Sequence, residues 1–244
     1  MAQPPPSAAV LVLHGGHETG TEPPPWGPLN LPGIRMRPFV RALRRATRAS
    51  EGGTEVLVRQ VRYVHRGWNG TRADALRDAL AALDAVGEEA GDVPVVLLGH
   101  SMGARAALRA AGHPLVRGVV GLAPWCPPGD PVTQLAGRDI VLVHSSRDRV
   151  TSPQATQSLT ARARRAGART CMVTVRGGDH AMIRRAPAWH RLTTTLVTGL
   201  LGTGTLPGPV TAALGLPPTA EPTEGTLDLD RLRAERGAGL QPSP

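Results

Sequence analysis

Short apolar runs alternate with longer amphipathic stretches along most of the chain. Runs rich in Val, Leu and Ile, typical of strands buried on both faces, lie near residues 9–13, 55–62, 94–98, 117–122, 140–144 and 171–175. Helical patterns fill the intervals, near residues 37–49, 72–86, 102–111, 153–165 and 187–201. Strands that alternate with helices predict an α/β fold, with a mostly parallel sheet of about six strands flanked by helices.

The pattern changes after residue 202. Residues 203–244 are rich in Pro, Gly and Thr and contain too few apolar positions to form a core of their own. We therefore expect one folded domain over residues 1–202, followed by a mostly flexible C-terminal tail over residues 203–244. A chain of 244 residues is long enough for one α/β domain with a substantial core.

The formal net charge of +9 would suit a nucleic-acid-binding protein, but the arrangement of the charges argues against one. All 28 basic residues are Arg, they are scattered along the predicted helices, and the few aromatic residues do not interleave with them. A nucleic-acid-binding domain would show a clustered basic patch or a known module. We expect no specific nucleic-acid partner.

The two cysteines, Cys126 and Cys171, form neither a disulfide framework nor a metal-ligand pattern, so no metal or other cofactor is expected. Residues 1–7 contain no basic region ahead of the first apolar run, which argues against a signal peptide. No apolar run is long enough to span a bilayer. The expected location is the cytoplasm, and the sequence does not indicate an oligomeric state.

The strand near 94–98 and the helix near 102–111 are joined by Gly99-His-Ser101-Met-Gly103. A serine in so sharp a turn stands clear of the sheet, and the flanking glycines let the chain pass closely. With a strand before it and a helix after it, this Gly-x-Ser-x-Gly turn resembles the nucleophile elbow of the α/β-hydrolase superfamily. The resemblance covers nearly all of residues 8–202 and is closest to small serine esterases that lack a lid.

The resemblance implies a nucleophile, an acid and a base in the chain order Ser, Asp or Glu, His. Asp148 follows the strand near 140–144, and His180 follows the strand near 171–175. Both would emerge at the carboxyl ends of strands, where open α/β sheets place their sites. We predict Ser101, Asp148 and His180 as the catalytic residues. In the alternative interpretation, Asp148 pairs with a flanking arginine, Arg147 or Arg149, and Asp179 is a weaker candidate for the acid.

The resemblance also implies an oxyanion hole made by two backbone N–H groups. One would come from the glycine-rich turn after the strand near 9–13, from Gly16 or alternatively His17, and the other from Met102. Two such donors stabilise the negative oxygen that develops during acyl transfer. The family's two opening antiparallel strands have no counterpart in this chain.

The connection between residues 123 and 138 is too short to hold the helical lid of capped relatives, which predicts an open site. Its expected walls include Trp125, Met182 and a stiff proline-rich loop that carries Trp26. Trp68 also follows a strand, where it either forms the floor of a pocket or pins its loop.

Together these features predict a metal-free serine hydrolase, in effect a carboxylesterase, that cleaves small carboxylic esters or thioesters through an acyl-enzyme. Its expected partner is therefore a small-molecule ester. The same groups could also serve a peptidase, a lactonase or a cofactor-free haloperoxidase. A non-catalytic ligand-binding protein with the hydrolase fold is the alternative from a different class.

Overall fold

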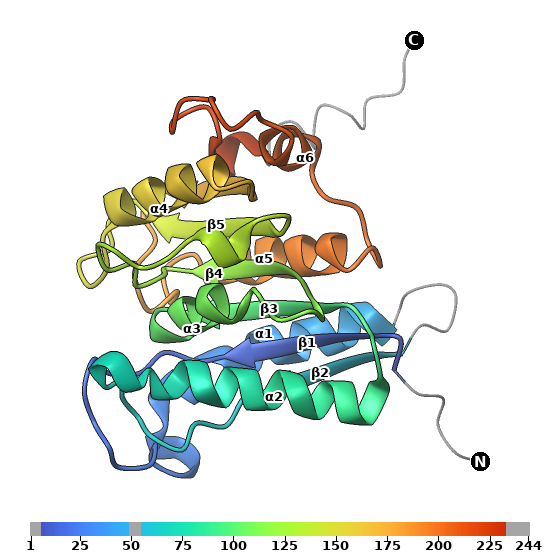
Figure 1. Ribbon diagram of the computed structural model, residues 1–244. Helices are drawn as coiled ribbons and strands as arrows, with labels where there is room; N and C mark the ends of the chain where they lie inside the picture. Colours follow the sequence, from blue (N-terminus) through green and yellow to red (C-terminus); the bar gives the residue numbers. More distant parts are fainter. Residues whose placement is uncertain (1–5, 49–54, 233–244) are drawn as a thin grey trace.

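A computed structural model describes residues 6–48 and 55–232. Seven parallel strands form one sheet in the order β2-β1-β3-β4-β5-β6-β7 (Figure 1). The strands are β1 (Ala8–Leu13), β2 (Val56–Gln60), β3 (Val95–His100), β4 (Val116–Leu122), β5 (Asp139–Ser145), β6 (Arg169–Val175) and β7 (Thr226–Asp228). The prediction of an α/β fold is confirmed, and so is the absence of opening antiparallel strands among the described residues.

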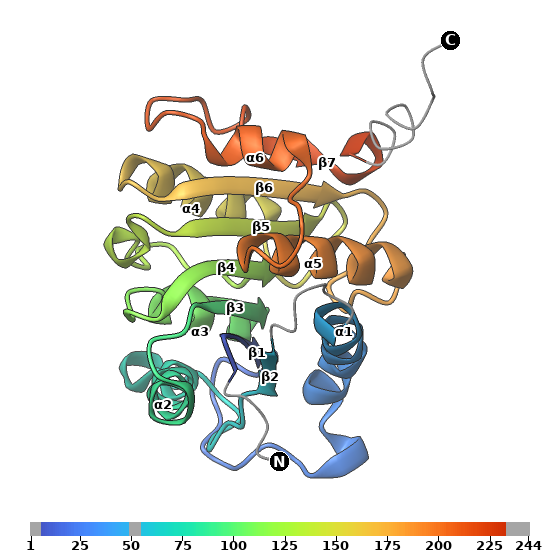
Figure 2. The same ribbon diagram turned by 90° about the vertical axis from the view of Figure 1, so that its right-hand side faces the viewer.

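Helices cover both faces of the sheet (Figures 1 and 2). One layer contains α2 (Asp74–Ala90), α3 (Met102–Ala110) and α4 (Pro153–Arg165), and the other contains α1 (Leu31–Arg48), α5 (Ala186–Leu200) and α6 (Gly208–Leu214). Short 3-10 turns occur at η1 (Gly27–Leu29), η2 (Gly70–Arg72) and η3 (Thr133–Leu135).

The strands are buried on both faces, as their apolar composition predicts. In β1, Leu11 and Leu13 belong to the core beneath α2 and α3, whereas Val10 and Val12 belong to the core beneath α1 and α5. This alternation follows from the two-residue period of a strand. A sheet with two apolar faces needs a helical layer on each side, and this chain supplies both.

The structure differs from the expected tail. Residues 226–228 form β7, which pairs in parallel with β6 through Met172 and Thr226, Val173 and Leu227, and Thr174 and Asp228. Helix α6 buries Val210, Ala213 and Leu214 in the core beneath α5. These residues of the segment thus pack against the core of the domain, and the composition of the segment alone does not predict this packing. Residues 233–244 of the expected tail lie outside the described residues.

Helix α1 begins six residues before its predicted start at residue 37. The Asn30 side chain accepts the Gly33 N–H over 2.9 Å and so caps the first turn. Pro38 lies inside the helix, where proline usually ends a helical pattern, and this favoured the later start. Helix α4 begins as predicted, with Ser152 Oγ accepting the Ala155 N–H over 3.2 Å.

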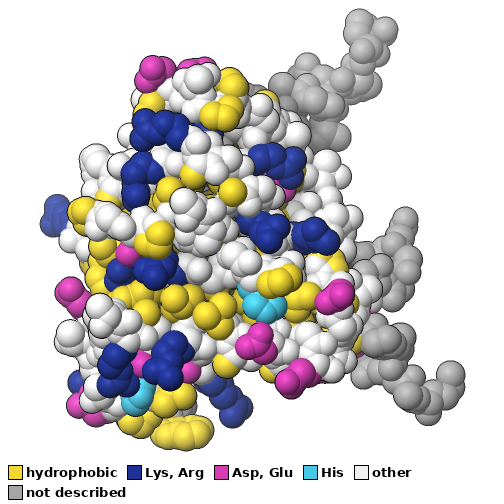
Figure 3. Space-filling view, viewed as in Figure 1, with side chains coloured by type: hydrophobic (Ala, Val, Ile, Leu, Met, Phe, Trp, Pro, Cys, Tyr) yellow, Lys and Arg dark blue, Asp and Glu magenta, His cyan; other side chains and the backbone are white. Residues whose placement is uncertain are grey.

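The connection from β4 to β5 contains only η3, and the described residues contain no cap domain. The carboxyl end of the sheet is therefore not covered by a helical lid. On the face shown in Figure 3, arginines are spread among apolar and acidic side chains. In residues 6–48 and 55–232, no helix combines the length and apolar character needed to cross a membrane.

Candidate active site

The three residues predicted to act in catalysis lie at one edge of the sheet. Ser101 follows β3, Asp148 lies in the turn after β5, and His180 lies in the loop between β6 and α5. Because the strands run parallel, their carboxyl ends meet at this edge. The topology therefore gathers side chains that are far apart in the sequence.

Ser101 joins β3 to α3 in a backbone conformation that few non-glycine residues adopt. Its φ is 54° and its ψ is −118°, and such strain persists only where the surrounding structure imposes it. A Cβ at Gly99 would lie 2.4 Å from the Cα of Ala104, and a Cβ at Gly103 would lie 2.4 Å from the carbonyl oxygen of His14. Only glycine fits at both positions, so the turn presents Ser101 at the end of the strand.

The backbone of Ser101 is tied to its surroundings, whereas its hydroxyl is unpaired. Ser101 N–H donates to the Leu122 carbonyl over 3.0 Å, and the Ser101 carbonyl accepts the Trp125 N–H over 3.2 Å. Among the described residues, Ser101 Oγ makes no hydrogen bond, including none to His180. The His180 ring contacts the ring of His100, the residue before Ser101, with the two centroids 4.9 Å apart. Hydrogen bonds of this kind often tighten only when substrate binds.

A buried carboxylate lies behind the His180 imidazole. His180 Nδ1–H donates to Asp148 Oδ2 over 2.8 Å, and the Asp148 side chain is fully buried. Asp148 Oδ1 accepts the backbone N–H groups of Val150 (2.8 Å) and Thr151 (3.0 Å). A proton on Nδ1 leaves Nε2 of His180 as a proton acceptor. The flanking arginines form no ion pair with this carboxylate among the described residues.

A second histidine contacts the same carboxylate oxygen. His144, fully buried at the end of β5, places its Nε2 3.2 Å from Asp148 Oδ2. Because a carboxylate oxygen can only accept, the ring proton lies on Nε2, and Nδ1 then accepts from Thr156 Oγ1 over 2.7 Å. The Thr151 hydroxyl lies 3.1 Å from Asp148 Oδ2 and 3.3 Å from each histidine. The sequence patterns did not predict these roles for His144 and Thr151, although a histidine in an otherwise apolar strand is a usable signal.

These contacts set the protonation state of Asp148. Burial alone would raise the pKa of its carboxyl group. Hydrogen bonds from His144, His180 and the N–H groups of Thr151 and Val150 outweigh the burial and hold the pKa of Asp148 well below its usual range. Asp148 is therefore ionised at neutral and mildly acidic pH. In the described part of the chain, no group of three or more His, Cys, Asp or Glu side chains is placed to hold a metal ion.

His100 supports the loop that carries His180. Its Nε2–H donates to the His180 carbonyl over 2.9 Å, while its buried Nδ1 has no hydrogen-bond partner among the described residues. Burial, and next the neighbouring His180 ring, lower the pKa of His100 to about 3. The ring is therefore neutral in the folded protein and fixes the backbone of His180.

The lowered pKa of His100 predicts a loss of stability in acid. Between about pH 6.5 and pH 3 the unfolded chain binds a proton at His100 that the folded chain does not, so the free energy of unfolding falls by up to about 1.4 kcal/mol per pH unit. We expect His100→Gln to flatten this slope in denaturant titrations at a series of pH values. Equal slopes for the variant and the wild type would contradict the prediction.

The turn after β1 lies against the start of α3. A Cβ at Gly16 would lie 2.3 Å from the Cε of Met102, so the Met102 side chain packs against this turn, and a Cβ at Gly103 would lie 2.4 Å from the carbonyl oxygen of His14, so the backbone of α3 approaches the end of β1. The N–H groups of Gly16 and Met102 have no partner within the described residues and can donate to a ligand. Met102 also begins α3, where the helix dipole favours negative charge. The N–H of His17, the alternative donor, is already used, because it donates to the Arg66 carbonyl over 3.0 Å.

The residues predicted as pocket walls lie in three different environments. Trp26 is 85% exposed and lines a cavity beside the turn after β1. Trp125 is half-buried, and its ring meets that of Trp68 edge to face at 6.2 Å. Arg105 lies over both rings, 4.0 Å and 4.4 Å from their centroids.

Two of the residues predicted to line the pocket, Trp68 and Met182, are buried. Trp68 is only 2% exposed, which favours the interpretation that it pins its loop, although one edge lines a shallow hollow with Trp125. Met182 is also 2% exposed and packs in the core beneath α5. The structure therefore differs from the prediction for Met182, because its positive φ of 59° turns the chain there and places the side chain in the core.

Comparisons with known proteins support the assignment of the fold. A family model described as serine aminopeptidase, S33, matches residues 62–141. No curated protein sequence matches the chain. A putative α/β hydrolase from Agrobacterium tumefaciens has a TM-score of 0.60 and 17% identity, with 85% of this chain and 93% of that chain covered.

Two solved esterase structures are similar at the level of the fold. Est1E from Butyrivibrio proteoclasticus, with ferulic acid bound, has a TM-score of 0.59 at 12% identity and covers 82% of this chain and 91% of its own. A Pyrobaculum calidifontis esterase has a TM-score of 0.58 at 13% identity and covers 81% of this chain and 77% of its own. With its parallel sheet and the serine turn after β3, the chain has the α/β-hydrolase fold, without a cap domain among its described residues.

Proposed function

We propose that this protein is a serine hydrolase that cleaves small carboxylic esters or thioesters through an acyl-enzyme. Ser101 would be the nucleophile, His180 the general base and Asp148 the acid behind it. The observation that carries the proposal is the 2.8 Å hydrogen bond from His180 Nδ1 to a buried carboxylate, at the sheet edge where Ser101 is held in a strained turn. A hydrolase family model and solved structures of esterases support the same class of reaction.

In the acylation step, His180 Nε2 takes the proton of Ser101 Oγ as that oxygen attacks the substrate carbonyl carbon. The bond to the leaving oxygen or sulfur then breaks, and His180 returns the proton to the leaving group. Asp148 stabilises the imidazolium while it exists, because it remains ionised beside Nδ1. The products of this step are a free alcohol or thiol and an ester of Ser101.

Deacylation repeats the sequence with water. His180 removes a proton from a water molecule, the resulting oxygen attacks the acyl carbon, and the proton then passes to Ser101 Oγ. The carboxylic acid leaves and the serine is regenerated. In both steps the N–H groups of Gly16 and Met102 would bind the negative oxygen of the tetrahedral intermediate.

A peptidase is the second candidate, favoured by the description of the matching family model. Its chemistry needs the same residues, with His180 protonating an amine leaving group instead of an alcohol. A panel of short 4-nitrophenyl esters, thioesters, lactones and aminoacyl 4-nitroanilides separates these activities. We expect the esters and thioesters to react fastest, and faster turnover of the aminoacyl anilides would favour the peptidase.

A fluorophosphonate probe tests the proposal directly. We expect the wild type to form one covalent adduct, which peptide mass spectrometry locates on Ser101. A protein that neither reacts with the probe nor turns over any substrate of the panel would overturn the proposal. If ligands of this kind raised its melting temperature without turnover, the binding-protein alternative would gain support.

His144 is expected to act as a positioning residue for Asp148. Replacing His144 with Phe removes one donor to Asp148 Oδ2, and we expect kcat for a short ester to fall about tenfold with little change in KM, since one hydrogen bond to a charged group is lost. His144→Gln can present an amide N–H to the same oxygen and is expected to recover most of the rate. Equal losses in the two variants would mean that His144 serves only packing, and thermal unfolding curves check that both fold.

A further inference from the structure

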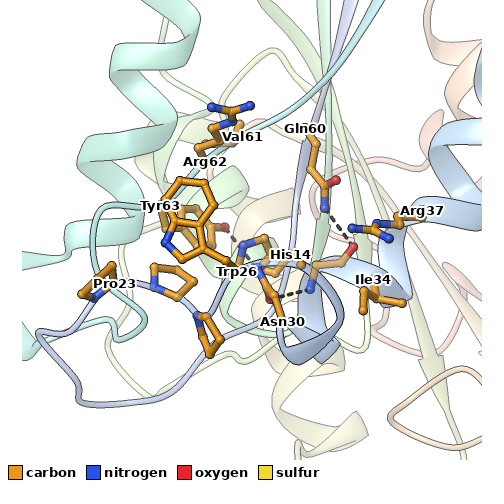
Figure 4. Close-up of a pocket in the computed structure, with 14 residues that line it drawn as sticks. His14, Pro23, Trp26, Asn30, Ile34, Arg37, Gln60, Val61, Arg62 and Tyr63 are labelled. Carbon is orange, nitrogen blue, oxygen red and sulfur yellow. Dashed lines mark hydrogen bonds between the residues drawn. The ribbon is translucent and has the colours of Figure 1, made fainter.

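A cavity of about 430 Å³ lies at the carboxyl ends of β1 and β2, and Ser101 lies at the same end of the sheet, after β3. It is bounded by the loop Pro23–Gly27, by the first turns of α1 and by the segment that follows β2 (Figure 4). Its volume falls within the range of pockets that bind small molecules.

The cavity borders the proposed oxyanion turn. His14, at the end of β1, lines it. The next residue, Gly15, lies against the serine, since a Cβ at Gly15 would be 3.4 Å from the Cβ of Ser101. Tyr63 fixes this wall by donating its hydroxyl proton to the His14 carbonyl over 3.0 Å. A ligand in the cavity would therefore lie one strand away from the reacting carbonyl.

One side of the cavity is apolar and stiff. Pro23, Pro24 and Pro25 restrict the loop, because each fixes its own φ. Trp26 follows them with 85% of its surface exposed. A large aromatic ring left in water gains free energy when an apolar group covers it. Ile34 of α1 adds a half-buried apolar side chain.

The opposite side is polar and cationic. Figure 4 shows Gln60 and Arg37 across the cavity from Pro23 and Trp26, with His14 between them. Arg37 and Arg62 both line the cavity, but Figure 4 shows Arg62 on the side of Trp26 and away from Arg37. No acidic side chain lines the cavity, and neither arginine has an ion-pair partner among the described residues.

Other arginines near the cavity, in contrast to Arg37 and Arg62, form ion pairs. Arg59 of β2 pairs with Glu89, and Arg66 pairs with Glu22 of the proline loop. Glu22, the acid beside the cavity loop, is therefore already paired with Arg66. The positive charges of Arg37 and Arg62 at the cavity have no such partner among the described residues. Burial lowers the pKa of His14, so the floor between the two sides is neutral.

The order of the strands decides which part of an ester would enter. The cavity lies at β1 and β2, Ser101 follows β3, and His180 follows β6 on the other side of the serine. The leaving group must face His180 to receive its proton. The acyl part must therefore extend away from His180, towards the cavity.

A second hollow, lined by Trp68, Arg105 and Trp125, is a weaker candidate for an anion. Its central cation is already paired, since Arg105 makes two hydrogen bonds of 2.7 Å to Asp130. Arg105 also lies between the two tryptophan rings, which holds it in place.

We propose that the cavity at β1 and β2 binds the acyl part of the substrate and selects acyl groups with an apolar body and a terminal carboxylate, that is, half-esters of dicarboxylic acids. The apolar body would lie on Trp26 and the prolines, and the carboxylate would bind Arg37 on the opposite side. This inference rests on the proposed function, because it assumes that Ser101 carries the acyl group.

A matched pair of substrates tests the proposal. The mono-4-nitrophenyl ester of adipic acid and the 4-nitrophenyl ester of adipamic acid differ only by a terminal carboxylate or carboxamide. We expect the wild type to prefer the acid in kcat/KM by about tenfold, the effect of one charge-assisted hydrogen bond at a partly exposed site. Arg37→Gln should lower this ratio. Arg117→Gln makes the same charge change at the exposed amino end of β4 and should leave the ratio unchanged.

Binding to an inactive variant separates the two proposals. In the Ser101→Ala background, calorimetry with monoethyl adipate needs no turnover. We expect binding that weakens about tenfold with Arg37→Gln and also weakens with Trp26→Ala, but not with Arg117→Gln. Equal rates for the acid and the amide, or binding that is unchanged by Arg37→Gln, would overturn the cavity proposal while leaving the serine hydrolase intact. A wild type without probe labelling or turnover would overturn the proposed function, whatever the binding result.

Discussion

Replacing Ser101 with Ala is expected to lower kcat for a short 4-nitrophenyl ester by about 10⁴-fold or more, the scale found when a catalytic serine is removed from a triad. The variant lacks the hydroxyl that would form the proposed acyl-enzyme, so His180 and the proposed oxyanion donors would have no nucleophile to assist. Fluorophosphonate labelling should disappear with the activity. Initial rates with purified protein, measured against the uncatalysed reaction, give the size of the loss.

The strained backbone makes this substitution a clean one. At a φ of 54°, Ala and Ser each carry a Cβ and experience the same steric cost, so the fold should be unaffected. Ser158→Ala, on the exposed face of α4, is the matched control and should keep full activity and labelling. A Ser101→Ala protein as active as the wild type would mean that the reaction does not pass through this hydroxyl.

Much of the fold was predictable because the strands satisfy one simple condition. β1 and β3 are apolar at every position between their ends, which only a strand with helices on both faces can be. Six of the strands and five of the helices follow from this alternation of patterns. β7 could not be found in the same way, because three residues are too few to show a period and their pairing depends on β6.

In the candidate site, too, the residues marked by local sequence patterns were predictable, and those whose roles depend on tertiary contacts were not. Ser101 was predictable because glycines flank it in the sequence. Asp148 and His180 were predictable because each follows an apolar run that the sequence identifies as a strand. His144, Thr151 and His100 were not predicted, because their roles depend on which side chains face each other after the sheet forms. No local pattern encodes the contact between β5 and the loop after β6.

The pocket walls were the least predictable part. Trp26, Trp68 and Trp125 were assigned from their positions in loops expected near the carboxyl end of the sheet, but the structure leaves Trp26 in water and buries Trp68 beneath Arg105. Whether a tryptophan lines a cavity or pins a loop depends on packing with residues far along the chain. The cytoplasmic location expected from the sequence stays a prediction.

Replacing Asp148 with Asn is the second substitution with a large expected effect, a fall in kcat of about 10⁴-fold at neutral pH, as when the carboxylate of a comparable triad is removed. An amide in this place can donate a proton to His180 Nδ1, which would force the ring proton onto Nε2. The imidazole could then no longer accept the proton of Ser101, and no negative charge would stabilise the imidazolium. Rates with a short ester, together with KM, measure the loss.

Asp148→Asn is also expected to change how the free energy of unfolding depends on pH. The pKa of Asp148 is lower in the folded than in the unfolded protein, so the carboxylate stabilises the fold above about pH 4, and this contribution is lost as pH falls through the lower, folded pKa. Asp148→Asn should therefore be less stable than the wild type at pH 7 and approach it in acid. His144→Phe keeps the carboxylate and its bond to His180, so its activity should fall far less. If Asp148→Asn lost stability but retained its rate, the carboxylate would be a structural group, and the His180 base would need another partner.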